Sequence, residues 1–317
     1  MTLLLGALFL VAVVGYLAQI TNLCMVRGVS ECLKGNPEFL LAILFCGTWI
    51  WLAALTSHFI DAQLQLKVFE ANLWFAMGGL LFGLGAALNQ GCSISTLSRL
   101  MRGDSQMAAT LIGWIIGWFV LTQWHPDIQV VELAPPAIGT YGSLLVLSLL
   151  IVCWVLHGDK ARKKRWFSMM GIGLIAGFLL IYEPNWSPSR LLRDLSAAMT
   201  DKLADKDNPH WPELPRYYFL LALLIGMYLA AWRCKHFKFT PASWSSALIH
   251  LLAGTMMGLG ASLAMGGNDA QLLLALPVLS PAGFVAVLCI LLGIVLGLKI
   301  GQLILTVRKN AEKQIIK

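Results

Sequence analysis

The chain has 317 residues, of which 58% are hydrophobic and 12% carry a formal charge. Soluble domains carry charge on about 25% of their residues, because they must cover their surface with polar groups. The composition therefore excludes soluble, fibrous and disordered proteins and indicates an integral membrane protein. The net charge of +7 does not indicate a nucleic-acid partner, because the basic residues lie between apolar runs, where they orient a membrane protein.

Nine segments are long and apolar enough to cross a bilayer as helices, at about 20 residues for each crossing. They are 2–20, 39–60, 72–90, 107–124, 141–157, 166–183, 216–233, 243–264 and 282–307. Two shorter pieces, 92–101 and 268–279, follow Gly-rich span ends and predict re-entrant or half helices, which need protein or water around their broken backbone. The predicted fold is an all-α integral membrane protein.

Lysine and arginine are distributed unevenly over the connecting segments. One alternate set, 21–38, 98–106, 158–165, 233–240 and 308–317, holds 16 of them, and the other set holds 5. The positive-inside rule places the first set in the cytoplasm, the N-terminus outside and the C-terminus inside. In the opposite set, the polar connection 184–215 predicts a short surface helix with a mixed-charge face, formed by Asp201, Lys202, Asp205, Lys206 and Asp207.

A glycine motif occurs twice. The stretch Gly79–Cys92 aligns without gaps with Gly254–Gly267, at an offset of 175. We therefore expect a first copy at 1–124, a connecting part at 125–165 and a second copy at 166–317, running in opposite directions because five spans precede the second. Inverted repeats with broken helices are typical of transporters. Glycines spaced in this way also serve close helix packing; we interpret the motif as packing combined with a functional break.

The seven cysteines have neither zinc-ligand nor disulfide spacing. Cys46, Cys153 and Cys289 lie within spans and are interpreted as apolar fillers. Cys24 and Cys92 instead stand at helix breaks among polar residues and glycine; spacing alone leaves a structural and a functional role open for each. Their neighbours are Asn22 and Arg27 in the first break, and Asn89, Gln90, Gly91 and Ser93 in the second.

The second break predicts an anion site. A helix beginning after Cys92 directs free N–H groups and partial positive charge toward residues 91–93. Ser93 is a candidate cap of that helix. In the second copy, Asp269 would repel an anion, so we expect it to cap its helix or face away. No catalytic residue, metal site or cofactor is predicted, since the sequence has no nucleotide-binding loop and no intramembrane pair of histidines.

These motifs resemble the YeeE/YedE family, a sulphur-transport family of bacterial inner-membrane proteins, over essentially the whole chain. The resemblance implies a permease for thiosulfate or a related sulfur or selenium compound, with a relay of cysteines lining its constriction. Cys24 and Cys92 match two relay positions. Members of the family often have a further Gly-Cys in the second copy, where this chain has Gly266 and Gly267, followed by Asn268.

The leading hypothesis is therefore uptake of a small sulfur-containing anion that passes between Cys24 and Cys92. Asn22, Asn89, Gln90 and Ser93 would replace part of its hydration, and Gly266, Gly267 and Asn268 would form the opposing break. Arg27 would attract the emerging anion or anchor the chain to lipid headgroups. The alternatives are sulfur transfer through a persulfide on Cys92 and transport of an unrelated small solute. Beyond the lipid bilayer, the candidate protein partner is a cytoplasmic sulfur carrier or rhodanese-like protein.

Overall fold

A computed structural model describes residues 2–60, 67–124, 130–134, 141–203 and 210–315. The first helices are α1 (Thr2–Thr21), α2 (Met25–Leu33), α3 (Glu38–Leu44), η1 (Cys46–Trp49), α4 (Ile50–Phe59), α5 (Leu73–Leu88), α6 (Ser93–Met101) and α7 (Gln106–Trp124). The others are α8 (Tyr141–Leu156), α9 (Lys160–Tyr182), α10 (Pro188–Leu203), α11 (Leu214–Arg233), α12 (Trp244–Leu263), α13 (Asn268–Ala270), η3 (Gln271–Ala275) and α14 (Pro281–Ile315). The predicted all-α membrane fold is confirmed.

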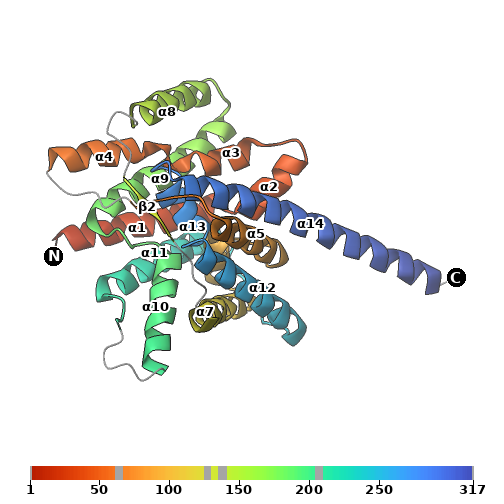
Figure 1. The fold of residues 1–317 in the computed structure, drawn as a ribbon. Coiled ribbons are helices and arrows are strands. Elements are labelled where there is room, and N and C mark those ends of the chain that lie inside the picture. The colour runs from red at the N-terminus through yellow and green to blue at the C-terminus, as the bar shows by residue number, and fades with distance from the viewer. Residues whose placement is uncertain (1, 61–66, 125–129, 135–140, 204–209, 316–317) are drawn as a thin grey trace.

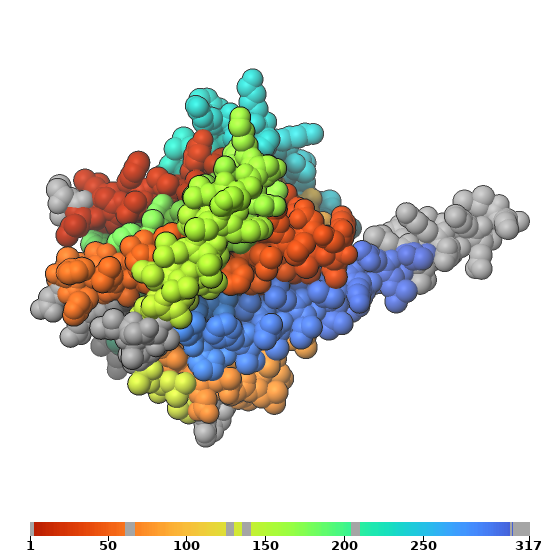
Figure 2. Space-filling model, turned by 90° about the horizontal axis from the view of Figure 1, so that it is seen from above, coloured from red at the N-terminus to blue at the C-terminus, as the bar shows by residue number. Residues whose placement is uncertain are grey.

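Within the described residues, eight helical segments are long and apolar enough to cross a membrane. The ninth predicted span is α8, an apolar helix of 16 residues, which is short for a crossing of about 20. Figure 1 shows the two chain ends at opposite ends of the bundle. In Figure 2, α8 lies on the outside of the molecule over α3 and α4, and Figure 1 shows the ribbon of α14 extending beyond the other helices.

Two details differ from the predicted helices. The span predicted as continuous over 39–60 is interrupted near its middle by η1, a short 3-10 turn. The connections also contain one short antiparallel pair of strands, β1 (Val68–Phe69) with β2 (Glu132–Leu133). Ser280 fixes this pair at the start of α14, because its hydroxyl lies 3.1 Å from the backbone nitrogen of Phe69 and 3.2 Å from its oxygen.

The helices that end with a non-glycine residue in the left-handed conformation include α1, α5 and α12. Asn22, Gln90 and Met265 have φ angles of 51°, 55° and 57°. In each case the next backbone N–H reaches back five residues, 2.9 Å from Leu23 to Ala18, 2.9 Å from Gly91 to Ala86 and 2.7 Å from Gly266 to Ala261. These are Schellman-type caps, and they end α1, α5 and α12 abruptly inside the protein.

The repeated glycines lie where helix backbones touch. A β-carbon on Gly83 would lie 2.2 Å from the carbonyl oxygen of Ile290, and one on Gly258 would lie 2.2 Å from that of Trp114. The predicted role of these glycines in close packing is therefore confirmed. This close packing brings α5 against α14 and α12 against α7, and α5 and α12 also pack on each other.

Helices from the two predicted copies pack mainly on one another. α5 packs on α14 and α12 on α7; similarly, α1 packs on α11, and α9 on η1 and α4. Such an exchange of partners is what two interlocked copies would produce. The division at 1–124, 125–165 and 166–317 stays a prediction.

The helix predicted in the polar connection 184–215 is α10, but it is more than a surface helix. Leu191 and Ala198 on one of its faces are buried, and the helix packs on α7 and touches α13. Its C-terminal end is exposed at Lys202, as expected for a mixed-charge segment. Asp205, Lys206 and Asp207 lie outside the described residues.

Candidate functional site

Two helix breaks from opposite halves of the chain meet where α6 contacts α13, and Figure 1 shows α13 in the middle of the bundle. The Oδ1 atom of Asn268 accepts hydrogen bonds from the backbone N–H of Ser93 at 3.2 Å and from its hydroxyl at 2.5 Å. The same hydroxyl lies 3.1 Å from Oδ1 of Asp269. All three residues are buried, so this contact fixes the two short helices to each other.

Asp269 faces a different helix from the one predicted. Its Oδ2 atom accepts a hydrogen bond from the backbone N–H of Ser189 at 3.1 Å. It therefore caps the N-terminus of α10, where negative charge is stabilised by the free N–H groups. The prediction that Asp269 caps its own helix or faces away is therefore wrong: it caps a helix whose residue Ser189 lies 80 positions earlier, and it also lines the cavity beside Cys92.

The two cysteines predicted to be functional lie side by side. Cys24 is the N-cap residue of α2 and Cys92 is that of α6. Their thiols lie within hydrogen-bonding reach of each other, and each also faces backbone N–H groups: those of Arg27 and Cys92 for the first, and those of Met25 and Ser95 for the second. The two sulfur atoms therefore sit between two helix N-termini, in a region of positive electrostatic potential.

A small apolar cavity of about 30 Å³ adjoins Cys92. Its walls are mainly the side chains of Leu23, Met25, Ile43, Ile94, Met169, Ile172, Leu272 and Leu273. Asn268, Asp269 and the thiol-bearing residues Cys92 and Cys46 complete the lining. An anion inside this cavity would have few water neighbours.

Cys46 was interpreted as an apolar filler from the sequence, yet it lines the same cavity as Cys92. The 3-10 turn η1 brings it there. Gly173 permits the close approach, because a β-carbon at this position would lie 1.6 Å from the carbonyl oxygen of Cys46. The sequence contained one signal of this position, the pair Cys46-Gly47 inside a span. That signal could not be interpreted from the sequence, because the position of Cys46 depends on its packing against α9, which lies far away in the sequence.

Asn89 connects the break after α5 to three neighbouring polar side chains through hydrogen bonds. Its amide nitrogen donates to the Gly91 carbonyl at 3.0 Å and to the Thr96 hydroxyl at 2.8 Å. Its Oδ1 atom lies 2.7 Å from the Thr110 hydroxyl and 2.8 Å from Nδ1 of His250. All its hydrogen-bonding capacity is thus used within the protein, and its predicted contact with the permeating anion stays a prediction.

Three further predicted residues, Asn22, Arg27 and Gln90, are at least partly exposed. Gln90 is exposed, and Oδ1 of Asn22 accepts a hydrogen bond from Arg102 at 3.1 Å. Arg27 is 46% exposed, forms an ion pair of 2.7 Å with Glu31, and lies over the ring of Phe39. Its charge is therefore partly neutralised, and both of its predicted roles remain open.

Two arginines near these residues had not been predicted. Arg99 donates to the carbonyl oxygen of Asn89 at 3.1 Å and pairs with Asp104 at 2.8 Å. Burial and the charge of Arg99 lower the pKa of Arg102, against the opposing effect of Asp104. The two guanidinium groups thus hold the polypeptide at the breaks after α1 and α5.

Gly266 and Gly267 have no room for a larger side chain. Gly266 has a φ angle of 152°, a conformation that favours glycine. A β-carbon on Gly267 would lie 2.8 Å from Oδ1 of Asp269 and 3.1 Å from Cζ2 of Trp114. The structure therefore leaves no space for a cysteine at this second-copy break.

Comparisons with known proteins identify the family of the chain. A family model described as "Sulphur transport" matches residues 21–189 and 166–296. Among characterised proteins, the chain is similar to the thiosulfate transporter TsuA of Escherichia coli strain K12. The two sequences are 22% identical, and the alignment covers 92% of this chain and 93% of that protein.

Proposed function

The chain belongs to the sulphur-transport family, and on this premise we propose that it is a bacterial inner-membrane permease that takes up thiosulfate. Its N-terminus would lie outside and its C-terminus in the cytoplasm. The similarity to a protein named as a thiosulfate transporter supports this substrate. The observation that carries the proposal is the contact between the thiols of Cys24 and Cys92 at the N-termini of two helices.

The anion would first enter the cavity beside Cys92. A thiol is a weak hydrogen-bond donor and suits the polarisable terminal sulfur of thiosulfate. Since the cavity walls are mostly apolar, the anion would leave most of its water behind, and the N–H groups of α6 would offset part of that loss.

The anion would then pass from Cys92 to Cys24. Because the two thiols are neighbours, contact with the second can begin before contact with the first is lost. Several weak sites in series let an ion enter without being trapped, as in channel filters. Passage in this form requires no covalent bond and leaves the substrate chemically unchanged.

The direct test is uptake of radiolabelled thiosulfate by the purified full chain in proteoliposomes, with sulfite, sulfate and selenite compared in parallel. We expect thiosulfate to be taken up fastest. Cys92→Ala and Cys24→Ala should each lower the rate by roughly tenfold or more, as expected if each thiol contributes at least about 1.4 kcal/mol to passage.

Cys289→Ala is the matched control. Its β-carbon lies against Gly79, at the α5–α14 contact, and it lines neither the cavity nor the thiol pair, so uptake should be unchanged. Full uptake by Cys92→Ala would contradict the proposed path. A persulfide on Cys92, detected by mass spectrometry during turnover, would instead favour sulfur transfer.

A further inference from the structure

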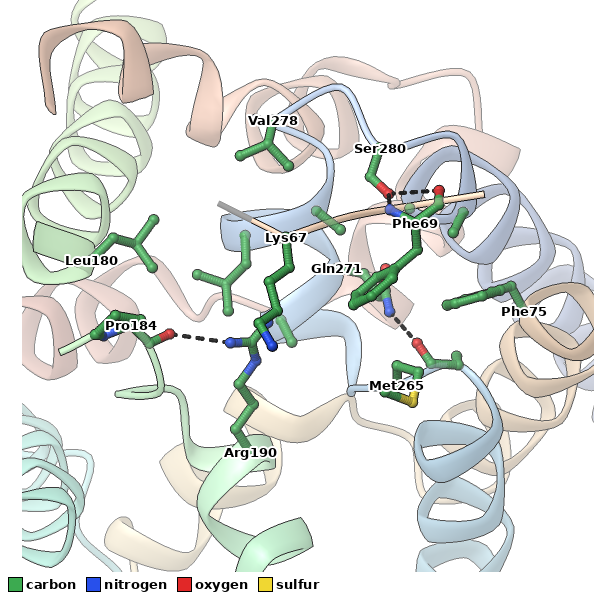
Figure 3. Close-up of a pocket in the computed structure, with 16 residues that line it drawn as sticks. Lys67, Phe69, Phe75, Leu180, Pro184, Arg190, Met265, Gln271, Val278 and Ser280 are labelled. Atoms are coloured by element: carbon green, nitrogen blue, oxygen red, sulfur yellow. Dashed lines mark hydrogen bonds between the residues drawn. The ribbon is translucent and has the colours of Figure 1, made fainter. Parts of the chain in front are cut away.

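A second pocket lies close to the thiol cavity and has a different chemistry. Figure 3 shows Arg190 from α10 and Lys67 from the segment before β1 directed into the same space, together with Gln271 from η3. The pocket has a volume of about 30 Å³, room for one or two water molecules or part of a small ion. No cysteine lines it.

Arg190 brings a positive charge to this pocket and forms no close ion pair with a carboxylate in the described part of the chain. Its Nη1 atom donates to the carbonyl oxygen of Pro184 at 3.2 Å and to Oδ1 of Asn185 at 3.0 Å. Its Nε atom is buried and has no hydrogen-bond partner. The residue is partly buried, and its Nε–H has unused hydrogen-bonding capacity for an anion.

The carboxylates nearest to Arg190 are engaged elsewhere. Asp194 lies 2.6 Å from Arg193 and 2.7 Å from Arg216. Asp269 accepts hydrogen bonds from Ser93 and Ser189. Both carboxylates therefore act on the charge of Arg190 only from beyond ion-pair distance.

Gln271 is a second group with unused hydrogen-bonding capacity. Its side chain is 4% exposed, and its Nε2 atom donates to the carbonyl oxygen of Ala264 at 2.6 Å. Its Oε1 atom is buried without a partner. This acceptor suits a water molecule carried in with an anion, or the ammonium group of Lys67 at the rim of the pocket.

The short helix from α13 to η3 separates the two cavities. Ala270, Gln271 and Leu274 line the charged pocket, whereas Asp269 and Leu272 line the thiol cavity. The charged pocket and the thiol cavity are therefore lined by different residues of one short helical segment.

We propose that the Arg190–Lys67–Gln271 pocket is an anion-binding site that holds a tetrahedral sulfur oxyanion by its oxygen atoms before it reaches the thiols. The guanidinium and ammonium groups recognise the hard oxygens, and the thiols then recognise the soft sulfur. Both cationic segments belong to the set of connections that the charge distribution places outside. The assignment of a sulfur oxyanion as ligand rests on the proposed function.

Sulfate is the probe for this pocket, because it has the oxygens of thiosulfate but lacks its terminal sulfur. Sulfate binding to the purified full chain in detergent is measured by isothermal titration calorimetry at low ionic strength. We expect Arg190→Gln to weaken binding about tenfold or more, since a charged hydrogen-bond donor is lost. Arg190→Lys should recover part of the affinity, and Lys67→Gln should weaken it several-fold.

Lys202→Gln is the control, since it removes the same charge from the exposed end of α10 and should leave sulfate affinity unchanged. In proteoliposomes, Arg190→Gln should raise KM for thiosulfate more than it lowers kcat. Equal sulfate affinity in the wild type, Arg190→Gln and Lys67→Gln would overturn the proposal, as would the absence of sulfate binding to the wild type. Failure of the proposed function gives a different result: no thiosulfate uptake by the wild type, with sulfate binding still dependent on Arg190.

Discussion

Asn268 accepts two hydrogen bonds from Ser93, a residue 175 positions earlier in the chain. This separation equals the offset between the two copies of the glycine motif, so the residues that meet are those that the alignment pairs. The contact joins the two short helices directly beside Cys92 and its cavity. The geometry of the thiol site therefore depends on a polar contact between the two halves.

Substitution of Asn268 tests this dependence. Asn268→Ala removes the acceptor and leaves the N–H and hydroxyl of Ser93 buried without it, which costs about 1–3 kcal/mol. We expect a lower melting temperature in detergent and a loss of thiosulfate uptake. Asn36→Ala, at an exposed position, is the control, and an unchanged melting temperature in Asn268→Ala would show that the contact carries no stability.

Cys46 should contribute to transport although it lies within a span. Cys46 lines the same cavity as Cys92, so Cys46→Ala removes one weak hydrogen-bond donor from the proposed path. We expect uptake to fall roughly fivefold, the effect of about 1 kcal/mol, and Cys46→Ser to recover part of it. Cys153→Ala, which changes an exposed cysteine on α8, should not alter uptake; equal rates in both alanine variants would make Cys46 a filler after all.

The close glycine contacts should tolerate no side chain. Gly258→Ala would place a β-carbon 2.2 Å from the carbonyl oxygen of Trp114. This is too close for a contact, so α12 and α7 must separate. Overpacking of this kind costs typically about 1–3 kcal/mol. Gly142→Ala is the matched control, because nothing lies within 4 Å of its β-carbon. Thermal unfolding should separate the two variants, and equal midpoints would refute the packing role.

The ion pairs of Asp194 should make the attachment of α10 sensitive to acid. Burial acts to raise the pKa of Asp194, but Arg193 and Arg216 outweigh it and hold the pKa below its usual value. A depressed pKa in the folded state stabilises the protein above the unfolded-state value, about 3.9, and this stability is lost as the pH falls through the folded-state value. Asp194→Asn should flatten the acid limb of a pH–stability curve measured by thermal unfolding. An acid limb identical to that of the wild type would contradict this assignment.

Much of the architecture followed from the sequence because the bilayer imposes local requirements. A crossing needs about 20 apolar residues, and a break needs a few glycine and polar residues, so the spans and the breaks at 89–93 and 264–268 were predictable. The position of Cys92 at a helix N-terminus was predictable for the same reason, whereas the helix α2 after Cys24 was not predicted, because 21–38 was interpreted as a connecting segment.

Only the tertiary structure decided which of these local features meet. Three features depend on how segments far apart in the sequence pack together. They are the contact between the two thiols, the place of Cys46 in the cavity, and the Nε atom of Arg190 that has no hydrogen-bond partner. Periodicity and motif spacing carry no record of such contacts, because each element satisfies its local pattern whichever neighbour it finds. The low charge content indicated that the interior carries mainly uncharged polar groups, and packing determined which of them line the cavities.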